Sequence, residues 1–293
     1  MASLKHDLEY LAARAGFGLV SLLSARQADL FAVAIGNLAY RILASRRRVA
    51  FDNIKRALGG SLGDGDIDVI VRKVFQNVSR SFIETARFGK LKQDGLRKIV
   101  VGAGEDYIRQ AHERRKGGII LTAHFGNWEM LGAWVTTLGY DMDLVVGVQH
   151  NRKMHDLING CRKEMGSGII EVTTSSMRQM YKALKANHFL GFAADQHAPA
   201  RNLELDFFGR KAAVASGPAQ LAIRTGCAIL PLLLVREQFD RHVVIAGEPI
   251  YAPEGGDEQE NMVHITKRYL RFWETTISKY PDQWMWTHKR WKI

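Results

Sequence analysis

Short apolar, β-branched runs alternate with helical segments through the last two thirds of the chain. These runs predict strands, because buried parallel strands are nearly continuous in Val, Ile and Leu. The predicted strands cover residues 99–101, 118–123, 144–148, 169–172, 189–194, 229–235 and 243–246. Helices fit residues 105–115, 127–138, 152–165, 175–186, 215–225 and 257–279. This alternation predicts an α/β fold with a mostly parallel central sheet flanked by helices.

The first part of the chain has a different pattern. Residues 15–25 and 30–40 are two uncharged runs of 11 residues each, and each is shorter than the ~20 apolar residues of a spanning helix. A signal peptide fits poorly, because Asp7 and Glu9 precede the first run and no clear small-residue cleavage site follows it. We therefore expect N-terminal helices over residues 1–58, attached to one α/β domain over residues 59–293.

The distribution of charge along the chain suggests a function for these helices. The 293 residues carry 41 Lys and Arg against 30 Asp and Glu, a net charge of +11. Residues 1–120 hold 21 basic and 12 acidic residues, a net of +9, and three consecutive arginines, 46–48, follow the second apolar run. Apolar helices beside a cationic cluster predict attachment to an anionic membrane surface. A helical hairpin packed on its own core, with a solvated basic end, is the alternative.

The overall composition narrows the class of protein. A hydrophobic fraction of 46% and a charged fraction of 24% are typical of a globular chain. The two cysteines, Cys161 and Cys227, are too few for a disulfide framework or a cysteine-rich zinc site. The histidines other than His124, among them His150, His155 and His197, show no convincing metal-ligand spacing, so no metal site is expected.

Residues 119–130 (IILTAHFGNWEM) carry the candidate chemistry. A predicted strand ends at Ala123, His124 stands in the turn that follows, and ligands of open α/β sheets bind beyond the strands' carboxyl ends. His124 and Glu129 would point about 140° apart on one helix, so they can meet only if His124 precedes the helix, which Gly126 permits. A carboxylate bonded to one imidazole nitrogen leaves the other free as a base. A histidine that only caps the helix is the alternative.

At this point the residues resemble a family. HFGNWE, residues 124–129, is similar to the His-x4-acid motif of glycerolipid acyltransferases, in the form typical of the late acyltransferases of lipid A biosynthesis, the lauroyl and myristoyl transferases. Further similar segments occur in the family's order: RRVAFDNIKRAL (47–58), Asp195-Gln196, Phe207-Phe208-Gly209, SGPAQLAIRTGCAILP (216–231) and PDQWMWTHKRWK (281–292). The resemblance covers about residues 35–292.

The resemblance implies an O-acyltransferase without a metal or redox cofactor. Its donor would be a thioester of acyl carrier protein, and its acceptor a hydroxyl of an anionic lipid A precursor. Such an enzyme would work at the cytoplasmic face of the cell inner membrane, with the membrane lipid surface as a further partner and no nucleic acid. Residues 59–63 (GGSLG) have the Gly-x-Ser-x-Gly spacing, but they lie in a linker between helices and not after a predicted strand, as a nucleophile elbow requires. Cys161 has no adjacent base. Direct attack of the hydroxyl on the thioester is therefore expected instead of a covalent acyl-enzyme.

The resemblance also assigns roles to residues. His124 would remove the proton of the acceptor hydroxyl, and Glu129 would orient the imidazole and support it electrostatically. Arg162 would hold a phosphate or the thioester oxygen. The remaining expected substrate-binding residues shape the site or line an acyl pocket, and they are Asn127, Asp195, Gln196, Phe207 and Phe208.

Three alternatives remain open from the sequence. The acceptor could be a phosphatidylinositol mannoside or another lipid, although relatives of that kind tend to carry Asp where Glu129 stands. A basic lipid-binding or nucleic-acid-binding protein with a decayed site is a second alternative, and the intact His124 and Glu129 argue against it. A metallohydrolase fits least.

Overall fold

A seven-stranded sheet forms the centre of the computed structural model, which describes residues 2–198 and 202–291. The strand order is β1-β9-β8-β2-β5-β3-β4, and all neighbours are parallel except β8 and β9. The strands are β1 (Val100–Gly102), β2 (Gly118–Thr122), β3 (Met142–Val146), β4 (Gly168–Glu171), β5 (Phe189–Ala193), β8 (Ala228–Gln238) and β9 (Arg241–Ala246). The predicted mostly parallel sheet is confirmed, and each predicted strand corresponds to one of these.

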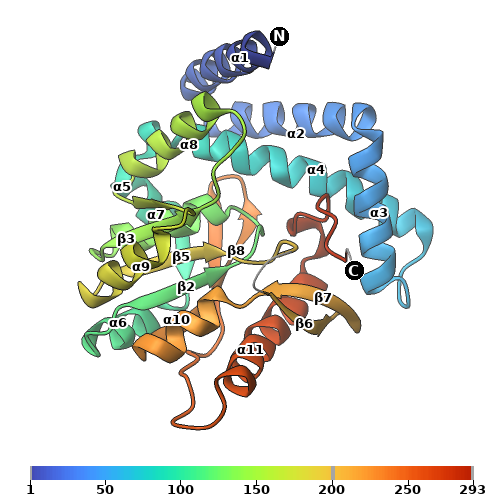
Figure 1. Cartoon of the computed structure of the whole chain (residues 1–293). Helices are drawn as coiled ribbons and strands as arrows, with labels where there is room; N and C mark the ends of the chain where they lie inside the picture. The colour runs from blue at the N-terminus through green and yellow to red at the C-terminus, as the bar shows by residue number, and fades with distance from the viewer. Residues whose placement is uncertain (1, 199–201, 292–293) are drawn as a thin grey trace.

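Helices cover both faces of the sheet (Figure 1). Side chains alternate along β2, so that Ile119 and Leu121 enter one hydrophobic core and Ile120 enters the other. Six helices correspond to the six that the sequence predicts. They are α6 (Glu105–Glu113), α7 (Trp128–Thr137), α8 (Arg152–Glu164), α9 (Ser176–Lys185), α10 (Gly217–Thr225) and α11 (Glu258–Lys279). Because β2 and β5 lie side by side in the middle of the sheet, the residues after them meet at its carboxyl edge.

The sequence pattern does not predict three parts of the structure: a helix, a hairpin and a 3₁₀ helix. The first is α5 (Phe88–Ile99), which is kinked at Lys92. The second is an antiparallel hairpin of β6 (Asn202–Phe207) and β7 (Arg210–Ala215). Its two-residue turn, Phe208-Gly209, has φ values of 53° and 67°, the left-handed conformation that tight hairpin turns require. A short 3₁₀ helix, η1 (Pro281–Gln283), precedes the tryptophan-rich C-terminal segment.

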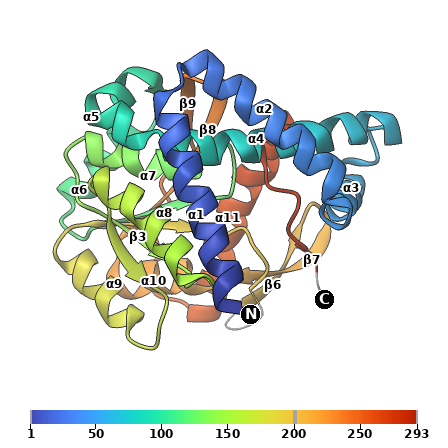
Figure 2. The ribbon, with the colours of Figure 1, turned by 90° about the horizontal axis from the view of Figure 1, so that it is seen from above.

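Four helices precede the sheet: α1 (Ala2–Leu22), α2 (Ala25–Ile42), α3 (Ala44–Leu58) and α4 (Asp64–Ala86). A side chain at Gly36 would collide with the backbone of Gln76, so α2 approaches α4 closely. Figure 2 shows α1 lying across α8, where Lys153 binds Asp7 at 2.7 Å. The division at residue 58 stays a prediction, and α2 and α3 both pack on α4 across it.

Taken singly, the N-terminal helices differ from membrane spans in length or hydropathy. In the described part of the chain, no helix by itself combines the length and the apolar composition that crossing a membrane needs. Together, α2 and α3 reach that length and hydropathy, but they are bent by 93° relative to each other. The membrane association of this segment therefore stays a prediction.

Candidate active site

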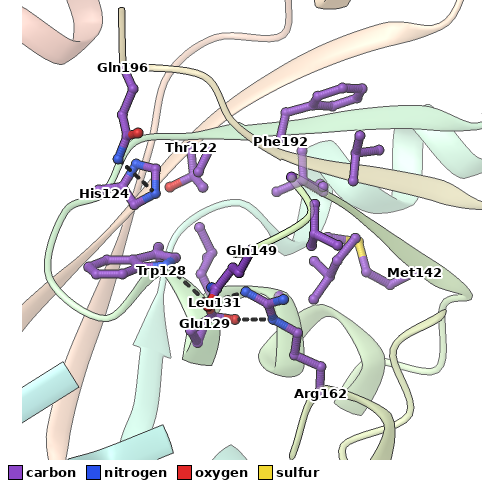
Figure 3. A pocket seen from close by; sticks show the side chains of 18 residues that line it. Thr122, His124, Trp128, Glu129, Leu131, Met142, Gln149, Arg162, Phe192 and Gln196 are labelled. Carbon is purple, nitrogen blue, oxygen red and sulfur yellow. Dashed lines mark hydrogen bonds and ion pairs between the residues drawn. The ribbon is translucent and has the colours of Figure 1, made fainter. Parts of the chain in front are cut away.

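A cavity of about 400 Å³ opens at the carboxyl edge of β2 and β5 (Figure 3). Polar side chains line the part near the strand ends, and they include His124, Gln196, Glu129 and Arg162. Apolar side chains line the rest, and they include Ile120, Leu131, Met142, Leu144 and Phe192. The cavity therefore joins a polar, titratable end to an apolar end.

His124 is held by a buried carboxylate from the neighbouring strand. Thr122 and Ala193 are paired in β2 and β5, so the segments that follow them run side by side. Oδ1 of Asp195 lies 2.7 Å from Nδ1 of His124 and accepts the backbone N–H of the same residue at 3.0 Å. The other carboxylate oxygen accepts the indole N–H of Trp284 at 2.6 Å. Asp195 thus has a partner for each oxygen and is only 3% exposed.

The electrostatics of this pair favour an ionised aspartate beside a basic imidazole. Burial lowers the pKa of His124, but the charge and hydrogen bond of Asp195 outweigh it, and Glu129 adds to them, so the pKa is raised. Burial raises the pKa of Asp195, but the charge and hydrogen bond of His124 outweigh burial, so the pKa of Asp195 is lowered overall. A carboxylate only accepts hydrogen bonds, so the proton of the neutral imidazole lies on Nδ1. Nε2 is then unprotonated and available as a base, and it accepts a hydrogen bond from the side-chain amide N–H of Gln196 at 3.4 Å.

Glu129 has a different partner from the one expected. It lies in the first turn of α7 and binds Arg162 of α8 through two hydrogen bonds, at 2.8 Å and 2.6 Å. It also accepts the indole N–H of Trp128 at 3.1 Å. Within the described residues, no hydrogen bond joins Glu129 to His124. Figure 3 shows Glu129 bonded to Arg162 and not to His124. The expectation that Glu129 orients the imidazole is therefore corrected: Asp195 is bonded to the imidazole instead, and Glu129 acts on His124 only through its charge.

Arg162 lines the cavity but is already engaged. Its guanidinium donates to Glu129 and, at 2.7 Å, to Oδ1 of Asn159. A guanidinium carries five N–H groups, and these contacts use three of them. Its predicted role in binding a phosphate or a thioester oxygen stays a prediction.

The structure places Asn127 behind the site instead of in the cavity. It is fully buried. Its side chain donates to Glu84 at 2.8 Å and accepts the backbone N–H of Met130 at 3.0 Å, which caps α7. Direct substrate contact by this residue is therefore corrected to a role in holding the turn before α7.

Phe207 and Phe208 also lie away from the cavity. Phe207 is fully buried at the end of β6 and packs against Trp284, with 5.6 Å between ring centroids. Phe208 packs against Phe207 and Trp286. Neither phenylalanine lines the cavity, so their expected role in an acyl pocket is corrected: Phe207 supports Trp284, which binds Asp195.

The two cysteines are poorly suited to act as nucleophiles. Burial raises the pKa of the Cys161 thiol to about 11, and Glu164 adds to this shift. Burial raises the pKa of Cys227 to about 11 as well. The thiolate is the reactive form of cysteine, so both side chains stay in the unreactive form near neutral pH.

Comparisons with known proteins agree on one class of enzyme. A family model described as "Bacterial lipid A biosynthesis acyltransferase" matches residues 4–293. The chain is 21% identical over 250 residues to the phosphatidylinositol mannoside acyltransferase of Mycolicibacterium smegmatis, covering 82% of this chain and 79% of that protein. It is 23% identical over 260 residues to the lipid A biosynthesis palmitoleoyltransferase of Escherichia coli K12, covering 88% and 82%. It is 22% identical over 261 residues to the lipid A biosynthesis lauroyltransferase of the same bacterium, covering 88% and 83%.

Proposed function

The chain belongs to the bacterial lipid A biosynthesis acyltransferase family, and we propose that it transfers a fatty acyl chain from acyl carrier protein to a hydroxyl of a lipid A precursor. The observation that carries this proposal is the contact of His124 with Asp195 at the polar end of a cavity whose other end is apolar. A base and an apolar chain-binding surface are the two features that such a transfer needs.

His124 acts as the general base in this proposal. Nε2 takes the proton of the acceptor hydroxyl as its oxygen attacks the thioester carbonyl carbon. The carbon–sulfur bond then breaks, and the leaving thiolate takes the proton from the imidazolium. Asp195, bonded to Nδ1, stabilises the imidazolium between these steps. A positioned base contributes about 10²–10⁴-fold to the rate.

The apolar end of the cavity binds the acyl chain in this proposal. Met142 and Leu144 of β3 line it together with Gly191 of β5 and Gly132 of α7. The glycines allow Met142 and Leu144 to pack closely against β5 and α7, because a methyl group on Gly191 would lie 2.5 Å from the end of the Met142 side chain. These side chains therefore set the depth available to the chain.

The ion pair of Arg162 and Glu129 forms the charged part of the cavity wall that α7 and α8 supply. The ion pair fixes α7 against α8, and the N–H groups of Arg162 that Glu129 and Asn159 leave unused are available to a phosphate or to the thioester oxygen. The pair is mostly buried, and charge-assisted hydrogen bonds of this kind are strong.

We also propose that the N-terminal helices attach the enzyme to the cytoplasmic face of the inner membrane. Large apolar side chains are exposed along α1 and α2, among them Leu19, Leu22, Leu30 and Ile42. The arginines at 46–48 begin the next helix, α3. Exposed apolar side chains next to arginines suit an interface with anionic lipids.

A second acceptor class is favoured by one observation, the similarity to a phosphatidylinositol mannoside acyltransferase over 82% of this chain. Both acceptor classes are anionic glycolipids with free hydroxyls. The two differ in the sugars and lipid anchor, which the acyl pocket does not contact in this proposal.

The test is transfer of a radiolabelled acyl group by the purified enzyme in parallel reactions. Acyl carrier protein and coenzyme A serve as alternative donors, and a lipid A precursor and a phosphatidylinositol mannoside as alternative acceptors. We expect labelled lipid A precursor with the carrier-protein donor. Labelling of the mannoside alone would establish the second acceptor, and no labelled lipid in any reaction would contradict the proposal.

A further inference from the structure

A buried ion pair lies behind the catalytic turn, outside the cavity. Arg236 of β8 donates to both carboxylate oxygens of Glu84 of α4, at 2.8 Å and 2.7 Å. The side chains are only 3% and 2% exposed. Burial raises the pKa of Glu84, but Arg236 and then His242 outweigh it, and the pKa falls to about 2. Both members of the pair are therefore charged at neutral pH.

This pair reaches the turn at residues 124–127 through three side chains. Glu84 accepts the amide N–H of Asn127, which caps α7. Arg236 donates to Oγ of Ser81 at 2.9 Å, and that hydroxyl donates to the carbonyl of Gly126. The backbone of Arg236 exchanges two hydrogen bonds with the side chain of Gln283.

Gln283 closes the network on the other side of the turn. The backbone carbonyl of Gln283 accepts the backbone N–H of Gly126 at 2.9 Å. Gly126 has a φ of 53°, and a methyl group there would lie 1.7 Å from the carbonyl oxygen of Leu234. Both polar groups of the Gly126 backbone are therefore held by residues connected to Arg236, two positions from the base.

We propose that Arg236 and Glu84 are positioning residues for acyl transfer: acting through Ser81 and Asn127, they fix the turn that places His124. This inference rests on the proposed function. Neither side chain lines the cavity, so neither touches the substrate.

The cost of burying the pair supports a role beyond stability. Taking two charges out of water is expensive, and apolar residues of similar volume are often equally stabilising. A pair retained for stability alone could therefore be replaced by apolar residues without loss of rate. A pair retained for position could not, because displacing the base by about 1 Å can lower the rate about 10²-fold.

Two buried hydroxyls of α4 offer a matched test. Ser81→Ala removes the link to Gly126 and leaves the ion pair in place. Thr85→Ala removes a hydroxyl that, among the described residues, donates to the carbonyl of Ser81 alone, within the helix. We expect Ser81→Ala to lower kcat about tenfold or more, with KM and the acid limb of the pH profile unchanged. Thr85→Ala should keep the wild-type kcat at a similar melting temperature.

A double variant, Glu84→Leu with Arg236→Met, tests the pair itself. We expect it to fold with a melting temperature near that of the wild type and to lose about 10²-fold in kcat. Wild-type kcat in this variant would overturn the proposal. If it does not fold, the comparison of Ser81→Ala with Thr85→Ala decides, and equal kcat values for those two would overturn the proposal.

The proposed function fails separately, in the wild-type enzyme. Absence of acyl transfer by the wild type refutes the function. Normal transfer by the wild type together with normal transfer by Ser81→Ala refutes only the positioning role.

Discussion

The imidazole of His124 lies between a buried carboxylate and an open cavity. Asp195 fixes its Nδ1 and raises its pKa, while Nε2 faces the cavity and Gln196. A raised pKa makes the nitrogen a stronger base, and it also means that the imidazole takes up a proton at a higher pH than a free histidine. The rate should therefore fall on acidification already above the ordinary pKa of histidine, 6.5.

Asp195→Asn tests this account of the base. An amide cannot stabilise the imidazolium, so we expect kcat to fall by about 10²–10⁴-fold. The pKa of His124 should also fall, which moves the acid limb of kcat/KM to lower pH. The measurement is kcat/KM as a function of pH for the wild type and the variant.

Asp143→Asn is the control for this variant. Asp143 binds Nδ1 of His188 at 2.8 Å, in a second histidine–aspartate pair that does not line the cavity. Its pH profile should match that of the wild type. An acid limb that stays in place in Asp195→Asn would contradict the assigned role of Asp195.

The sequence could indicate His124 but not its partner. Glu129 is five positions away and Asp195 is 71, so proximity in the sequence favours Glu129. The correct pairing depends on β2 and β5 being neighbours in the sheet. Charged residues such as Arg236, within an apolar strand, carry no local signal of a distant partner.

At the scale of elements, the cavity is shaped by where β3, β5 and α7 approach one another. Gly191 and Gly132 stand at the closest points, where a methyl group would lie 2.5 Å from Met142 and 3.0 Å from Leu144 respectively. The ends of these side chains can shift, so a small addition narrows the cavity without displacing the sheet.

Gly191→Ala should therefore change which acyl chains are accepted. We expect kcat/KM to fall for long acyl donors relative to short ones by about tenfold or more, because one methylene of space is worth about 10–200-fold in discrimination. Competition between donors of two chain lengths measures this ratio. Gly160→Ala, on α8 with open space around it, should leave the ratio unchanged, and an unchanged ratio in Gly191→Ala would contradict the assigned chain-binding end.

The elements that the sequence predicted are those with strong periodicity or buried β-branched runs. The β6–β7 hairpin alternates Leu203, Leu205 and Phe207 on its inner face, which is a strand signal of period two. The sequence does not reveal the hairpin, because its turn is Phe208-Gly209 instead of the common Asn-Gly or Asp-Gly. The kink at Lys92 similarly interrupts the helical pattern of α5.

At the scale of the whole molecule, the excess positive charge and most of the large exposed apolar side chains of the described residues belong to the N-terminal part. Leu22 is 81% exposed and Leu30 is 62% exposed. Leu22→Gln with Leu30→Gln should weaken binding to anionic vesicles at least about tenfold, because burying one leucine is worth about 1.5–3 kcal/mol. Binding of the wild type should also weaken as salt rises. Vesicle sedimentation measures both effects.

Val101→Gln with Val172→Gln is the control for vesicle binding. These side chains are exposed on the sheet domain, at 47% and 55%, and their replacement should leave sedimentation unchanged. Equal binding by both double variants would contradict attachment through α1 and α2.

The architecture could be predicted from the sequence because alternating strands and helices leave few arrangements. The relation of the first helices to the rest could not, because amphipathic helices suit a membrane and a protein surface equally. In the structure α2 packs on α4 through Gly36 and also leaves Leu30 and Leu38 exposed.

The central claim is that His124 is the base of an acyl transfer to a glycolipid. The most direct measurement is the initial rate of labelled acyl transfer from acyl carrier protein to a lipid A precursor by the wild type, His124→Ala and His264→Ala, an exposed histidine of α11. We predict a loss of about 10²-fold or more in His124→Ala and the wild-type rate in His264→Ala. Transfer by His124→Ala at the wild-type rate would contradict the account.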